Sequence, residues 1–129
     1  MAVRLYTKIN PRDPRFSTGG VIVIQWTGLT FATTDYGEAI QMPSLADRNV
    51  QLLGTLGVGG SVRLEGSNKE SPDETTATDW ATLNDPQGNP LDLSALKAEN
   101  IMENLLWIRP RVTAGDATTS LTVLLLLRK

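Results

Sequence analysis

The stretches GGSVRLEGSN (residues 59–68) and TSLTVLLLL (residues 119–127) indicate the fold of this chain. In the first stretch Val62 and Leu64 alternate with Arg63 and Glu65, the period-two pattern of a half-buried β-strand. In the second stretch one face of the strand is wholly apolar, with Leu121, Val123, Leu125 and Leu127. The other face carries Leu124 and Leu126, which are also apolar. A strand apolar on both faces is typical of the centre of a sheet, buried on both sides or partly covered by another subunit.

Two further strands are predicted before the first stretch. GVIVIQW (20–26) is apolar on both faces at its start and predicts a strand covered on both sides. NVQLLGTL (49–56) predicts another, and the glycines of 57–60 predict a hairpin that pairs it with residues 61–65.

The remaining segments are predicted from their turn residues. A strand is expected at 105–112. Because Pro110 has no backbone N–H to donate to a neighbouring strand, this strand should lie at the edge of a sheet or have its non-hydrogen-bonded side at Pro110. A short strand at 80–83 enters a turn, and residues 94–104 read as extended, with one helical turn as the alternative. The acidic segment 69–79 reads as an exposed loop.

Short strands separated by turns predict an all-β protein, an antiparallel β-sandwich or jelly-roll-like domain spanning residues 20–129. Residues 1–19 are predicted to form an extended N-terminal arm, because the prolines of NPRDPR (10–15) break regular structure. This arm is long enough to lie across a neighbouring subunit. The alternative is that it wraps its own domain or is disordered.

The 129 residues include no histidine and no cysteine, which removes the commonest metal ligands, the usual general base and the thiol nucleophile. The glycine-rich run 54–61 lacks the Gly-Lys-Ser/Thr ending of a phosphate loop. Nothing marks a carboxylate pair for glycoside hydrolysis or a calcium loop among the acids. We therefore expect no enzymatic activity, no catalytic residues, no cofactor and no metal.

The net charge of −2 is unevenly distributed. Residues 1–15 hold four basic and one acidic side chains, residues 65–103 two basic and nine acidic, and residues 104–129 four basic and one acidic. Such charged blocks can dock on partner surfaces of opposite charge and fix how the two proteins align. The simpler interpretation of the acidic block is a solvated face of the protein. Nucleic-acid binding is disfavoured because the domain is not basic. No signal peptide or membrane span is expected, since the longest apolar run is residues 123–127.

Candidate contact residues come from two places in the chain. Trp107, Arg109 and Arg111 share one strand face by period two, and an exposed tryptophan beside two arginines is typical of an interface. Cation–π packing within the subunit is the alternative. The arm contributes Arg4, Tyr6, Lys8, Arg12 and Arg15. The aromatic residues taken together read as core or interface anchors, with a sugar-stacking platform as the alternative.

Four segments carry a resemblance to a known family. These are ADRNVQ (46–51) through GT (54–55), GGSV (59–62) through EGSN (65–68), WATLNDPQG (80–88) and IRPRVTAGD (108–116). They resemble small virion proteins of tailed bacteriophages, the head decoration (cement) proteins, and the resemblance spans roughly residues 20–128. The acidic segment 69–79 departs from this pattern, where a short Asp/Gly turn is expected.

The resemblance implies a β-sandwich or jelly roll that binds the outer surface of a phage head and stabilises contacts between capsomers. It implies the major capsid protein as partner, a homo-dimer or homo-trimer, and assembly in the bacterial host cytoplasm. No nucleic-acid or membrane partner is expected, because of the charge and the short apolar runs described above. A phage tail-associated protein or a carbohydrate- or receptor-binding β-sandwich module is the alternative, and a minor head-completion component shares the same fold.

Overall fold

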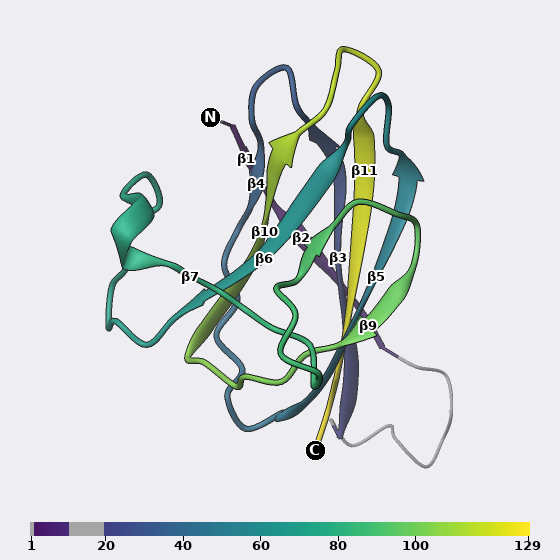
Figure 1. The fold of residues 1–129 in the computed structure, drawn as a ribbon. Helices are drawn as coiled ribbons and strands as arrows, with labels where there is room; N and C mark the ends of the chain where they lie inside the picture. Colours follow the sequence, from purple (N-terminus) through teal and green to yellow (C-terminus); the bar gives the residue numbers. More distant parts are fainter. Residues whose placement is uncertain (1, 11–19) are drawn as a thin grey trace.

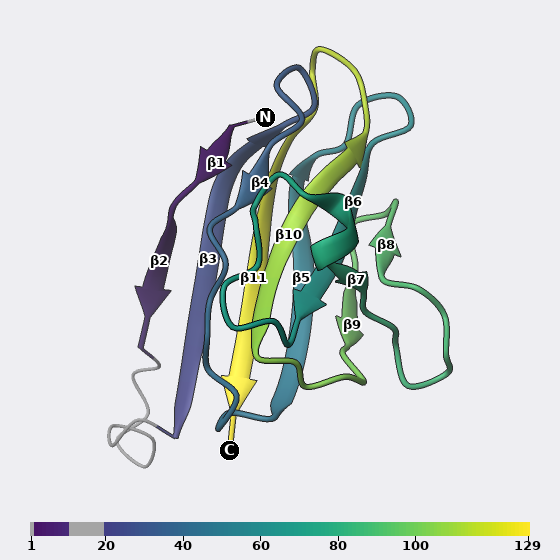
Figure 2. The same ribbon diagram turned by 90° about the vertical axis from the view of Figure 1, so that its left-hand side faces the viewer.

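The computed structural model describes residues 2–10 and 20–129, and these form two β-sheets packed face to face (Figures 1 and 2). The helical structure among the described residues is a turn of 3₁₀ helix at Ala77–Asp79. Nearly all strand pairs are antiparallel. The predicted all-β sandwich is confirmed.

Sheet A has the strand order β1-β4-β10-β6-β7, with β8 also paired to β6. Its long centre is the antiparallel pair β10 and β6, and the short β1 joins β4 in parallel. The strands are β1 (Val3–Arg4), β4 (Tyr36–Gly37), β10 (Trp107–Ala114), β6 (Ser61–Ser67), β7 (Ala81–Thr82) and β8 (Asp92–Leu93).

Sheet B has the order β2-β3-β11-β5-β9 and is antiparallel throughout. The strands are β2 (Tyr6–Ile9), β3 (Val21–Thr30), β11 (Ser120–Arg128), β5 (Asp47–Thr55) and β9 (Ala98–Asn100). The C-terminal strand β11 lies at the centre of the sheet, as its two apolar faces predict.

The core lies between the sheets and follows the period-two pattern of the sequence. From β11 the side chains of Leu121, Val123, Leu125 and Leu127 are fully buried, and from β6 so are those of Val62 and Leu64. Leu124 and Leu126 lie on the outer face of sheet B and are half-buried. The inner face of β11 is therefore part of the core of the single chain, whereas its outer face is partly open.

The predicted hairpin is wrong, because β5 and β6 lie in different sheets. Residues 56–60 cross from sheet B to sheet A, with Gly57 and Gly59 in the left-handed region at φ 69° and 68°. A side chain on Gly60 would overlap the carbonyl group of Leu56. Glycines serve a crossing as well as a hairpin, so the local sequence does not reveal which strands pair.

Pro110 lies inside sheet A, between β4 and β6. The N–H groups of Ile108 and Val112 donate toward the β4 side, to the carbonyls of Ile40 (3.1 Å) and Asp35 (2.9 Å). Pro110 stands between these two donors, where the ladder on the β4 side is interrupted. The alternative that Pro110 lies on a side of its strand without hydrogen bonds is therefore confirmed. The alternative that this strand lies at the edge of the sheet is wrong.

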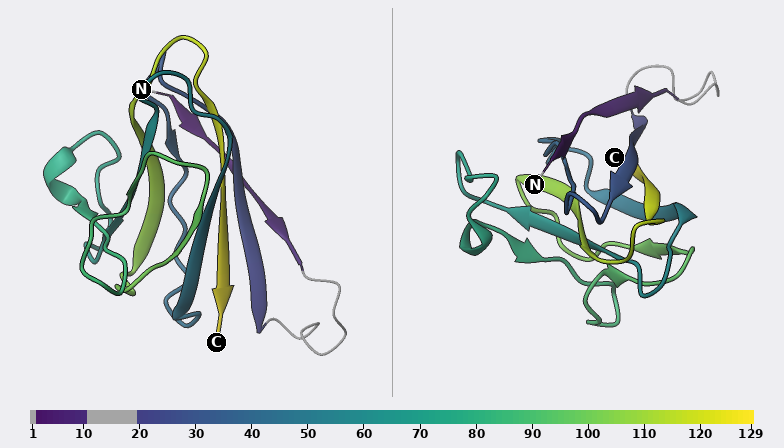
Figure 3. Two further views of the ribbon diagram at one scale, coloured as in Figure 1. Left: turned by 45° about the vertical axis from the view of Figure 1, so that its right-hand side comes forward. Right: turned by 90° about the horizontal axis from the view of Figure 1, so that it is seen from above.

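The described part of the N-terminal arm lies along its own domain (Figure 3). β1 joins sheet A and β2 joins sheet B, so the segment closes one edge of the sandwich. The Tyr6 ring meets the ring of the fully buried Trp26 edge-on, with centroids 6.5 Å apart. The Arg4 Nε donates to the buried carboxylate of Asp35 at 2.7 Å.

Candidate functional site

The outer face of sheet A gathers the interface residues predicted on the C-terminal half of the chain. The alternation of side chains along β10 places Trp107, Arg109 and Arg111 on this outer face. In the register of the two strands they lie opposite Ser67, Glu65 and Arg63 of β6. The loop between β6 and β7, which protrudes from the sandwich in Figure 1, returns over this face. The sequence therefore predicts which side chains share the face, while the loop decides which of them solvent reaches.

Arg109 is buried beneath this loop, with 1% of its surface exposed. Its Nε donates to Glu65 Oε1 at 2.9 Å and its Nη1 to the Glu74 carbonyl oxygen at 2.9 Å. The guanidinium carbon lies 3.9 Å from the ring centre of Trp80 and 4.7 Å from that of Tyr36. The expectation that Arg109 is displayed for a partner is wrong, because the chain itself supplies both aromatic faces and the carboxylate.

Burial shifts the pKa values within this cluster. Burial lowers the pKa of Arg109 and the nearby Arg111 lowers it further, while Glu65 opposes both effects. Burial raises the pKa of Tyr36, and its hydrogen bond to Glu74 adds to the rise. The stack is thus a structural ion pair with aromatic walls.

Trp107 lines a hollow of about 330 Å³ beside this stack. The indole N–H of Trp107 is buried and has no acceptor among the described residues. The other walls are Trp80, the carboxylate-bearing Glu38 and Glu74, and Ser71 and Pro72 of the loop. Aromatic rings, carboxylates and a hydroxyl therefore converge here.

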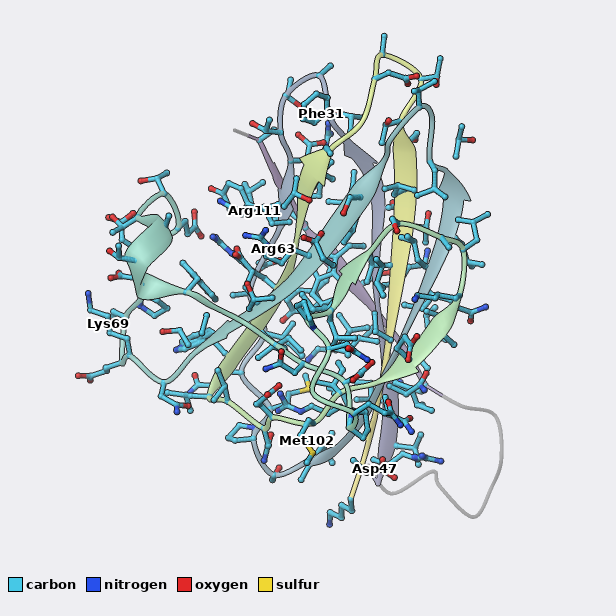
Figure 4. The ribbon with its side chains drawn as sticks, in the orientation of Figure 1. Phe31, Asp47, Arg63, Lys69, Met102 and Arg111 are labelled. Carbon is cyan, nitrogen blue, oxygen red and sulfur yellow. The ribbon has the colours of Figure 1, made fainter. Side chains whose placement is uncertain are left out.

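Arg111 and Arg63 line a second hollow, of about 370 Å³, with Thr34, Val112 and Thr113. Figure 4 shows the two arginine side chains next to each other on the outer face of sheet A. Arg63 Nη2 lies 3.3 Å from Asp92 Oδ2, and Arg111 Nε lies 3.6 Å from Glu65 Oε2. Both side chains are partly exposed, at 31% and 24%.

The arm residues are not gathered with this face. Arg4 is tied to Asp35 and Tyr6 packs on Trp26, while Lys8 is exposed on β2. Arg12 and Arg15 lie outside the described residues. The structure thus gives Arg4 and Tyr6 roles in holding the chain's own edge.

Sequence reasoning missed the outer face of sheet B as a surface. Leu124 and Leu126 lie at its centre, and Leu53 and Ile9 are 39% and 44% exposed. Around them the strand registers place neutral side chains: Thr7, Val23, Gln25, Asn49, Gln51, Ala98, Asn100 and Thr122. Among the described residues of this face, charge is confined to one end, where Arg128 pairs with Asp47 at 2.9 Å. The outer residues of β11 signalled this face, but the registers were needed to complete it.

Within residues 2–10 and 20–129, no three acidic side chains come together to hold a metal ion. No helix in that part of the chain is long and apolar enough to cross a membrane. Comparison of the chain with protein-family models, curated proteins and solved structures found no match.

Proposed function

We propose that this chain is a structural virion protein, a decoration protein that binds the outer surface of a phage head and stabilises contacts between capsomers. Its partners in this proposal are the major capsid protein and further copies of itself, as a homo-dimer or homo-trimer. The protein acts through its surface and carries out no reaction. The resemblance of the segments between residues 20 and 128 to head decoration proteins supports this proposal.

The observation that carries the proposal is the outer face of sheet B. Five strands at a spacing of about 4.8 Å, with about seven residues each at about 3.3 Å, span an area on the order of 500 Å². This face combines exposed leucine and isoleucine side chains with amides and hydroxyls, and holds its ion pair at one end. Depletion of charge in the middle of a surface is typical of the centre of a protein interface.

A face of this size is smaller than one side of a standard interface, about 800 Å². One such contact gives modest affinity by itself. On a capsid the same contact repeats, and linked copies make the second binding event intramolecular. An oligomeric decoration protein therefore attaches firmly through a small face.

The first test is the copy number in the virion whose genome encodes this chain, measured by quantitative mass spectrometry against the major capsid protein. We expect a copy number comparable to that of the capsid protein. A handful of copies per particle would assign the chain to the tail or portal region. Absence from the virion would reject the structural role altogether.

The second test adds charge to the proposed face without changing side-chain shape. Gln51 lies opposite Leu124 and Ala98 in the middle of sheet B. In Gln51→Glu, a carboxylate buried at the interface without a partner should weaken binding to undecorated capsids by about tenfold or more. Gln87→Glu, in an exposed turn away from this face, is the matched control and should bind like the wild type. Equal binding by both variants would exclude this face.

The hollow at Trp107 supports a second candidate, a carbohydrate- or receptor-binding module. Trp107 and Trp80 supply ring surface, and Glu38 and Glu74 supply hydrogen-bond acceptors. A glycan array probed with the wild type and with Trp107→Ala tests this function. Binding that is lost in Trp107→Ala and kept in Leu53→Ala, on the opposite sheet, would favour it over decoration.

A further inference from the structure

Two arginines face each other directly across the strand pair β10 and β6. The register places Arg111 opposite Arg63, whereas the neighbouring pair, Arg109 opposite Glu65, is complementary. Like charges in directly opposed positions destabilise a sheet. An arrangement of this kind requires a counter-charge nearby.

The chain supplies too little counter-charge for three arginines. Glu65 accepts a hydrogen bond from Arg109 at 2.9 Å and reaches Arg111 only at 3.6 Å. Asp92 lies 3.3 Å from Arg63 through one oxygen, and its other oxygen accepts from Ser61 and Thr113. Counted over these five charged groups, one positive charge is left over, while the carboxylate of Glu74 on the same face accepts a hydrogen bond from Tyr36.

The hydrogen bonds of the two arginines are also incomplete. The Nε atoms of Arg63 and Arg111 are buried and have no acceptor among the described residues. A buried donor without an acceptor carries an unrecovered desolvation cost. The Nε and Nη donors on one edge of a guanidinium match the two oxygens of a carboxylate. If the two side chains turn toward the hollow, an incoming carboxylate supplies the missing acceptors.

We propose that the hollow between Arg63 and Arg111 binds one carboxylate, from an acidic side chain or chain terminus of a partner protein. The guanidinium groups of both arginines donate to it, and the hydroxyls of Thr34 and Thr113 line the same hollow. The single positive charge left over among the five counted groups matches a carboxylate better than a doubly charged phosphate. This site is on sheet A and is independent of the proposed attachment through sheet B.

The test follows the Nε–H signals of the arginines by ¹H–¹⁵N NMR on the isolated full chain. Sodium acetate is titrated against sodium chloride and sodium phosphate at equal ionic strength. We expect acetate to shift the signals of Arg63 and Arg111 to saturation, and chloride to leave them in place. The Nε of Arg48, which already donates to the Leu45 carbonyl oxygen, is the internal control and should not move.

Substitutions separate the site from general screening by salt. Arg63→Gln and Arg111→Gln should each weaken acetate binding at least about tenfold, equivalent to about 1.4 kcal/mol. Arg128→Gln, at the charged end of sheet B, should leave it unchanged. If either glutamine variant fails to fold, Arg63→Lys serves instead. It keeps the positive charge but loses the paired N–H donors of the guanidinium group, so it should also weaken binding.

Three results would overturn the assignment. A chloride response equal to that of acetate would show screening only, and wild-type affinity in Arg63→Gln would remove that arginine from the site. Tighter binding of phosphate than of acetate would reject the carboxylate. None of these results depends on whether the chain decorates a capsid, so the two proposals fail separately.

Discussion

At the scale of single residues, Arg109 holds the loop between β6 and β7 against sheet A. Its guanidinium is enclosed by Tyr36 and Trp80 and is bonded to Glu65 and to the Glu74 carbonyl. A buried ion pair need not add net stability compared with apolar residues of the same volume. Removal of one partner is costly, however, because the other charge stays buried.

We therefore predict that Arg109→Ala destabilises the protein by about 3–5 kcal/mol, since Glu65 stays buried and keeps only its longer contact with Arg111. Urea unfolding followed by tryptophan fluorescence measures this loss. Arg128→Ala, which removes the exposed ion pair with Asp47, is the control and should cost no more than about 1 kcal/mol. Equal losses in the two variants would contradict the role assigned to Arg109.

Asp116 gives a prediction about pH. Hydrogen bonds from the Thr118 hydroxyl and from the backbone N–H groups of Val58 and Thr118 lower the pKa of Asp116 from 3.8 to about 2. Because the folded-state pKa is below the unfolded value, the stabilisation is fully present above about pH 4 and is lost as pH falls toward 2.

NMR titration of the Asp116 carboxyl should thus give a midpoint near 2. In Asp116→Asn the unfolding free energy should fall less between pH 5 and pH 2 than in the wild type, because one titrating group is removed. A carboxyl midpoint at the unperturbed value of about 3.9 would contradict the hydrogen bonds that link the two crossings between the sheets.

At the scale of elements, the N-terminal segment behaves as part of the sandwich. β1 and β2 extend one sheet each, Tyr6 covers the buried Trp26, and Arg4 neutralises Asp35. Asp35 also accepts hydrogen bonds from Thr30 and Thr33, so one carboxylate fixes both the β3–β4 turn and the arm. These contacts are characteristic of edge strands that belong to the fold.

Deletion of residues 1–9 should therefore destabilise the isolated domain, by at least about 2 kcal/mol for the lost burial around Trp26 alone. The folded protein should also show red-shifted tryptophan emission as Trp26 becomes hydrated. Thermal unfolding and fluorescence spectra measure both effects. Lys8→Ala, an exposed position on β2, should change stability by less than about 0.5 kcal/mol. An unchanged melting temperature after the deletion would show that the arm is independent of the sandwich.

At the scale of the whole molecule, the two faces of β11 have separate tasks. Leu125 pairs with Ile24 and Val50 inside the sandwich, while Leu124 pairs with Gln25 and Gln51 on the outer face. The first face holds the two sheets together. The second is the surface we propose for attachment.

Leu125→Ala should destabilise the isolated chain by about 2–5 kcal/mol, because it opens a cavity in the core. Leu124→Ala should cost less than about 1.5 kcal/mol by the same measurement, since its side chain is only half-buried. In a capsid-binding assay Leu124→Ala should nevertheless weaken attachment. If Leu124→Ala proved as costly to the isolated chain as Leu125→Ala, the outer face would already be covered in solution.

The sequence by itself determined the long strands of the two sheets and the faces of those strands, but not the short strands β4 and β8. Alternation in residues 61–65 and 119–127 reports burial directly, because side chains in a strand point to opposite sides at every step. The central place of β11 followed from its two apolar faces. The shared face of Trp107, Arg109 and Arg111 followed from the same period.

The tertiary structure alone decided which strands pair and in what register. β5 and β6 enter different sheets across residues 56–60, and β11 pairs with β3, which lies near the other end of the chain. Pairing between distant segments decided that Arg109 is enclosed, that Arg63 meets Arg111, and that the middle of sheet B is uncharged. Local periodicity fixes the direction of a side chain, whereas its neighbours depend on contacts that no short stretch of sequence encodes.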